Sequence, residues 1–238
     1  MWGSPGARVV HVPAPLDLLD HPTRDDLRVF LERLQRSGEP EVRLVARDGV
    51  LAVFGCTNPP SGLTDPGPVV LGMRAFALRP TADGEPPRDS LDVTVEGRAL
   101  LDRLARLHPM GLELEIPPMT VAAAWAGVLP PRGGWEPGGT IDLESLREVA
   151  REGIARVAAA LPQDPGDAVV RRVRREVWGT EIAPGLPAAA AFAAEMLGFL
   201  RGAGPATLAR SRAWRRLSTE AGHVLVRGGA QAGAGDVR

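Results

Sequence analysis

Residues 41–56, EVRLVARDGVLAVFGC, constrain the fold more than any other part of the 238-residue chain. Apolar and polar residues alternate on both sides of Asp48-Gly49, a pair that tolerates the positive φ angles of a type I′ turn. A two-residue loop fixes the register of the two strands. The pairs that we expect to face each other are Ala46 with Leu51, Leu44 with Val53, and Arg43 with Phe54. This stretch therefore predicts an antiparallel hairpin within a larger sheet.

Further strands and two helices are predicted around this hairpin in residues 1–118. Apolar residues recur at helical spacing over 23–37, with Thr23 as the expected N-cap. The other expected elements are strands at 69–78, 91–95 and 111–116 and a helix at 97–107. The N-terminal half is therefore predicted to be an α+β domain with a mainly antiparallel sheet and two helices.

The remaining residues favour helices. Residues 141–161 predict a helix capped by Asp142, and Gly153 inside it should weaken it slightly. The other expected elements are helices at 167–178 and 187–200 and a hairpin at 213–227 with its turn near 220–222. The predicted fold class is thus α+β, with a helical C-terminal half that ends in a β-hairpin. The boundaries drawn are 1–118, a Trp/Gly/Pro-rich connector at 119–141, a helical region at 142–227 and a disordered tail at 228–238; whether the two halves form one domain stays open.

Composition excludes several kinds of chemistry. All 28 basic residues are arginine and tyrosine is absent, so a Schiff-base lysine, a phosphate-loop lysine and a tyrosine general acid are all excluded. The single cysteine excludes an internal disulfide and a thiolate zinc cluster. The N-terminus lacks the apolar run of a signal peptide, and residues 187–200 are too short to span a membrane. We therefore expect a cytoplasmic protein with no membrane partner.

The segment 119–139, MTVAAAWAGVLPPRGGWEPGG, has two interpretations. A glycine-rich stretch before a helix could bind an anion, which makes Trp125, Arg132 and Trp135 candidate residues for a ligand or partner site. The spacing matches neither dinucleotide nor phosphate loops, and Glu136 would repel phosphate. We therefore favour a connector whose tryptophans pack on the core.

Six arginines form the basis of a nucleic-acid alternative. They are Arg171, Arg172, Arg174, Arg175, Arg215 and Arg216, and they lie near Trp178 and Trp214 in the sequence. Positive charge beside aromatic residues is typical of single-strand binding. Residues 166–227 contain 10 arginines against 5 carboxylates, which is only a mild excess of positive charge. Because arginine must also supply every ordinary surface cation here, we rank this alternative below a solvated surface.

No catalytic arrangement is evident. Cys56 at a strand end is more typical of a small buried residue than of a nucleophile, and the four histidines are scattered. Ser218 and His223 lie across the predicted turn and are interpreted as turn chemistry. We predict no metal site, no cofactor and no catalytic residue. The favoured function is a non-enzymatic protein-interaction or scaffold protein, including self-association, and an enzyme with a small-molecule cleft between the halves is a further alternative.

Several landmarks together resemble conserved hypothetical proteins of actinobacteria. They are TRDDLRVFLERL, LDVTVEGRALLDRLARL, WAGVLPPRGGWEP, FAAEMLGFL and WRRLSTEAGHVLVR, and they extend over nearly the whole chain. The resemblance implies a cytoplasmic protein from a GC-rich genome. It implies no activity, ligand or partner.

Overall fold

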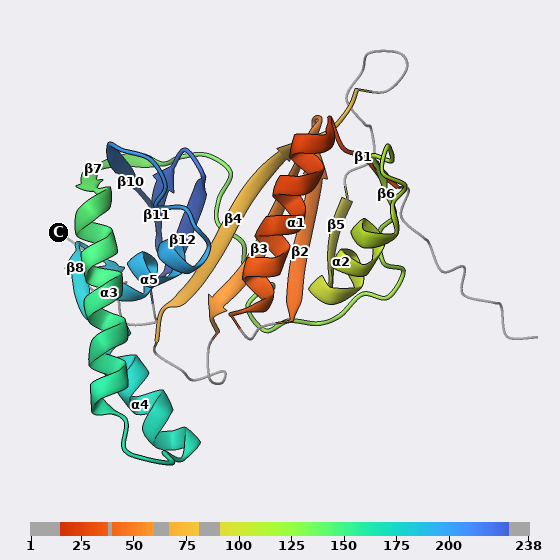
Figure 1. The fold of residues 1–238 in the computed structure, drawn as a ribbon. Coiled ribbons are helices and arrows are strands. Elements are labelled where there is room, and N and C mark those ends of the chain that lie inside the picture. Colours follow the sequence, from red (N-terminus) through yellow and green to blue (C-terminus); the bar gives the residue numbers. More distant parts are fainter. Residues whose placement is uncertain (1–14, 38–39, 60–66, 81–90, 229–238) are drawn as a thin grey trace, which may run out of the picture.

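The computed structural model describes residues 15–37, 40–59, 67–80 and 91–228 (Figure 1). The helices are α1 (His21–Gln35), α2 (Gly97–Arg106), α3 (Leu143–Ala160), α4 (Asp167–Trp178) and α5 (Ala188–Met196). The longer strands are β2 (Glu41–Arg47), β3 (Val50–Asn58), β4 (Val69–Ala77), β5 (Leu91–Glu96), β7 (Glu136–Asp142), β10 (Pro205–Ser211), β11 (Trp214–Thr219) and β12 (Gly222–Arg227). The short strands are β1 (Leu16–Asp17), β6 (Glu113–Leu114), β8 (Glu181–Ala183) and β9 (Leu186–Pro187).

One eight-stranded antiparallel sheet joins the two halves of the chain. Its strand order is β5-β2-β3-β4-β12-β11-β10-β7, so each half contributes four neighbouring strands. The halves meet where β4 pairs with β12, from Val69 opposite Arg227 to Met73 opposite His223. The two smaller sheets pair β1 with β6 and β8 with β9.

The hairpin that the sequence predicted is confirmed. Strands β2 and β3 pair Ala46 with Leu51, Leu44 with Val53 and Arg43 with Phe54. Asp48 and Gly49 have φ angles of 52° and 77°, as a type I′ turn requires. The predicted cap of α1 is wrong, because the helix begins earlier and Asp20 accepts a hydrogen bond from the Thr23 backbone N–H at 2.8 Å.

The predicted fold class is wrong for the C-terminal half. Residues 136–227 are not a helical region with one terminal hairpin, because they supply β7, β10, β11 and β12 to the large sheet. The sequence of β7, EPGGTID, does not alternate apolar with polar residues and has β-branched residues at only two positions. Strand β10 begins with proline. Both strands form because they pair with a neighbour, and such pairing overrides weak local preference. The predicted disordered tail at 228–238 lies outside the described residues except for Gly228.

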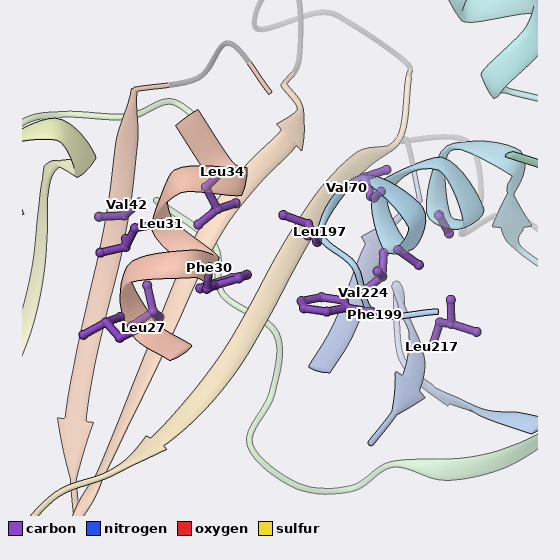
Figure 2. Packing of buried hydrophobic residues seen from close by; sticks show 14 of the residues in the cluster. Leu27, Phe30, Leu31, Leu34, Val42, Val70, Leu197, Phe199, Leu217 and Val224 are labelled. Carbon is purple, nitrogen blue, oxygen red and sulfur yellow. The ribbon is translucent and has the colours of Figure 1, made fainter. Parts of the chain in front are cut away.

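Helices α1, α2, α3 and α5 lie against one face of the sheet, and α4 packs on α3 and α5 beyond its end (Figure 1). Together they close the main core. Figure 2 shows Phe30 of α1 beside Phe199, and their ring centroids are 5.9 Å apart. The cross-strand pair Gly55 and Gly72 leaves room for two leucines, since a Cβ atom on either glycine would overlap Leu34 of α1 or Leu197 after α5. These glycines let the helices approach the sheet closely.

A second apolar cluster lies on the opposite face of the sheet. Its buried residues are Phe54, Cys56, Val69, Leu71, Trp125, Ala126, Trp214 and Leu225. The segment that follows β6 crosses this face and covers the junction between β4 and β12. Within the described residues, no helix is long and apolar enough to cross a membrane.

Candidate functional site

The three residues predicted for a connector site have different surroundings. Trp125 is only 2% exposed and belongs to the second apolar cluster, where Arg43 of β2 donates to the carbonyl oxygen of the adjacent Ala126. Trp135 is half-buried; its Nε1 donates to the Pro131 carbonyl oxygen at 2.9 Å, and the Arg216 guanidinium carbon lies 4.5 Å from its ring centroid. Arg132 is exposed. A ligand or partner role for these residues stays a prediction.

The structure separates the six arginines of the nucleic-acid alternative into two groups. Four lie on α4 and two lie on β11. Successive residues of a strand point to opposite faces, so Arg216 faces the connector while Arg215 lies on the helix side, where its Nε donates to the Pro184 carbonyl oxygen at 3.3 Å. The two arginines of β11 therefore extend from opposite faces of the sheet, although both line a pocket beside the edge strand β7.

Three of the α4 arginines line a pocket of about 360 Å³. It lies between α4 and the ends of β3 and β4, and so between the two halves of the chain. Its lining includes Thr57, Asn58, Arg171, Arg174, Arg175 and Trp178. Arg172 is absent from this lining, because it occupies another side of the helix. Sequence reasoning missed Thr57 and Asn58, whose only signal was their place at a strand end.

Neutral polar groups in this pocket already bond to carbonyl oxygens. Thr57 is the single buried polar residue in the described ranges, and its hydroxyl donates to the Val70 carbonyl oxygen at 3.2 Å. Asn58 Nδ2 donates to the Pro68 carbonyl oxygen at 2.7 Å, and the Ser37 hydroxyl donates to the Leu34 carbonyl oxygen at 2.6 Å. The arginines are therefore the main donors left for a ligand.

A second pocket, of about 350 Å³, adjoins the edge strand β7. Its apolar lining consists of Pro137, Pro184, Leu186, Leu208 and Ala209, and its cations are Arg210, Arg215 and Arg216. Arg210 pairs with Glu136 at 3.0 Å, but both side chains are more than 60% exposed and the pair adds little stability. Arg215 donates only to backbone carbonyl oxygens in the described part of the chain.

Ser218 and His223 form a hydrogen bond across β11 and β12. Ser218 Oγ lies 2.8 Å from His223 Nδ1, and the two residues are direct cross-strand partners. Burial, followed by the nearby positive charge of Arg216, lowers the pKa of His223. Among the described residues no carboxylate is recorded in contact with the ring, so the pair lacks the third group of a catalytic triad.

Cys56 and the acidic side chains are the remaining candidates for a nucleophile and for metal ligands. The Cys56 side chain is 1% exposed, which keeps reagents and substrates away from its sulfur. In the ranges that the structure describes, no group of three or more His, Cys, Asp or Glu side chains could hold a metal ion. The features described so far that could hold a ligand or partner are the pocket at α4, the pocket beside β7 and the open sheet edge at β7.

The sequence matches two domain families. Residues 12–127 match DUF8010 and residues 130–231 match DUF8185, and each family is described only as a domain of unknown function. The boundary between them falls in the segment that crosses the second face of the sheet. No functionally curated protein has a matching sequence.

Solved structures with a similar fold include bacterial sliding clamps of DNA polymerase. The clamp of Bartonella birtlesii bound to griselimycin is 13% identical, with a TM-score of 0.49 over 94% of this chain and 66% of the clamp. The Caulobacter crescentus clamp is 13% identical, with a TM-score of 0.47 over 92% and 65%. The Pseudomonas aeruginosa subunit is 15% identical, with a TM-score of 0.46 over 87% and 63%. The chain spans less than two thirds of each clamp, and the clamps' functions are not transferred to it.

Proposed function

We propose that this protein is a non-enzymatic interaction protein that binds an extended segment of a partner along β7. The open edge of the eight-stranded sheet carries this proposal. Strand β7 pairs with β10 on one side, and six of its seven residues are exposed. An edge strand offers unpaired backbone N–H and C=O groups, which bind another strand by main-chain hydrogen bonds.

The two edges of the sheet differ. At β5, the backbone N–H of Val121 donates to the Thr94 carbonyl oxygen at 2.9 Å, so the chain itself occupies part of that edge. No comparable backbone bond is recorded on the outer side of β7 in the described part of the chain. Pro137 lacks an N–H, which leaves Gly138–Asp142, a length of about 17 Å, for pairing.

The adjoining pocket favours a partner segment of particular chemistry. Pro137 and Gly138 of β7 line it together with Leu186 and Leu208, so a paired segment would bring a side chain to an apolar floor. Arg210 and Arg215 add positive charge beside that floor. We therefore expect the partner segment to carry an apolar residue next to acidic residues.

The test starts from affinity purification with the native cell lysate, with and without nuclease, to obtain a partner complex. Hydrogen–deuterium exchange on that complex should show protection of residues 136–142 and none of 91–96. Arg210→Glu should weaken binding at least tenfold, because it places like charge against acidic residues. Arg212→Glu is the matched control: Arg212 is exposed on the same hairpin and does not line the pocket.

Three results would contradict this function. Capture that disappears with nuclease would favour the nucleic-acid alternative. Protection confined to other elements would remove β7 from the interface. Equal weakening of partner binding by Arg210→Glu and Arg212→Glu would show that binding responds to the net charge of the protein and not to the pocket beside β7. Protection of β7 in a complex of two identical chains would support β7 as the binding edge and would identify the partner as a second copy of this chain.

A further inference from the structure

Among the described residues, α1, α2 and α3 each contain at least one arginine paired with a carboxylate, whereas α4 contains none. On α1, α2 and α3, arginines pair with carboxylates of the same helix: Arg28 with Glu32 at 2.9 Å, Arg98 with Asp102 at 3.2 Å, and Arg147 with Glu144 at 2.8 Å. Among the described residues, none of the four α4 arginines forms an ion pair. The helix carries four arginines against two carboxylates and is therefore net positive.

The pocket concentrates this charge at one place. Arg171, Arg174 and Arg175 lie at positions i, i+3 and i+4, which share one face of a helix, and all three line the 360 Å³ pocket. Among the residues that the structure describes, no carboxylate lines this pocket. Asp167 and Glu176, the acidic residues of α4, lie outside it. A pocket lined by three guanidinium groups that have no ion-pair partner among the described residues favours an anionic ligand.

We propose that this pocket binds the phosphate group of a small phosphorylated ligand. Guanidinium groups match phosphate oxygens in planar two-point contacts, and the volume lies in the range of small-molecule sites. Asn58 keeps a second amide N–H beyond its bond to Pro68, which adds a neutral donor near the arginines. The pocket lies on a different surface from β7, so the phosphate-site proposal is tested independently of the proposed partner strand.

The geometry favours a small ligand over a nucleic-acid chain. A phosphate backbone is followed by cations along an extended track. Here the cations converge in one pocket, while Arg172, the fourth arginine of α4, lies outside it. The remaining candidates, Arg215 and Arg216, lie on β11 and point to opposite faces of the sheet. Replacing Arg172 should therefore weaken nucleic-acid binding as much as replacing its neighbours does. The same replacement should leave phosphate binding in the pocket unchanged.

Isothermal titration of the full chain with inorganic pyrophosphate tests this site. The triple variant Arg171→Gln, Arg174→Gln and Arg175→Gln should bind pyrophosphate at least tenfold more weakly than the wild type. The matched control Arg172→Gln should bind it as the wild type does. All four side chains are exposed, so the variants should fold, and far-UV circular dichroism with a urea transition verifies this.

Two further ligands separate the alternatives. Citrate at the same concentration should bind more weakly than pyrophosphate, and equal affinity would overturn the phosphate assignment. A single-stranded oligonucleotide that binds more tightly than pyrophosphate and is weakened equally by Arg172→Gln would overturn the small-ligand assignment. Absence of pyrophosphate binding, or binding unchanged in the triple variant, would remove the site altogether.

Discussion

Replacing Gly153 with alanine should destabilise the protein, although the same substitution stabilises most helices. Gly153 lies in the middle of α3, where alanine is favoured over glycine by about 1 kcal/mol. An ideal Cβ at this position would lie 2.5 Å from Cη2 of Trp178 and closer still to Cζ3. The indole ring would have to move by about 1 Å to restore normal contact.

Trp178 has little freedom to move. It is 7% exposed, and its ring stacks on Phe192 of α5 with centroids 4.5 Å apart. Overpacking at such a site costs about 1–3 kcal/mol, and the helical preference of alanine recovers about 1 kcal/mol. Because three indole atoms would be too close to the new Cβ, the overpacking cost should lie in the upper part of that range, about 2–3 kcal/mol, which leaves a net loss of about 1–2 kcal/mol in the free energy of unfolding.

Urea unfolding followed by far-UV circular dichroism measures this loss. Glu152→Ala, an exposed change one residue away, is the control and should alter stability by less than about 0.5 kcal/mol. In a Trp178→Phe background the smaller ring leaves space, so Gly153→Ala should be neutral or stabilising. A Gly153→Ala protein as stable as the wild type, or an unchanged cost in the phenylalanine background, would refute the steric explanation.

Two other predictions concern the second face of the sheet. Trp125→Ala should lower the free energy of unfolding by about 3–5 kcal/mol because Trp125 is 2% exposed. Trp135→Ala should lower it by only about 1–2 kcal/mol because Trp135 is half-buried. Equal losses in urea unfolding would contradict this difference. Burial lowers the pKa of His223 below its ordinary 6.5, so the unfolded chain binds a proton more readily than the folded one. The contribution of His223 should be complete above pH 6.5 and decrease as the pH falls below it, and His223→Gln should remove that part of the pH dependence measured between pH 7.5 and 5.5.

Local patterns were sufficient for elements whose signals lie within a few residues. The β2–β3 hairpin was predictable with its register because Asp48-Gly49 admits one kind of turn and the alternation on both sides agrees with it. Helices α3 and α4 were predictable because their apolar residues recur at helical spacing and Asp142 caps α3 with bonds from the Glu144 and Ser145 N–H groups. In these segments the local preference and the final structure coincide.

Contacts between residues far apart in the chain decided the edge strands of the sheet, the role of Gly153 and the pocket at α4. Strands β7 and β10 have weak strand character and form because β11 provides a pairing edge. Gly153 appeared to weaken its helix, yet it makes room for Trp178 of the next helix. The α4 arginines meet Thr57 and Asn58 only because β4 pairs with β12 and joins the halves. Periodicity reports the faces of single elements, whereas a pocket depends on which faces meet, and that information lies in the packing of residues far apart in the chain.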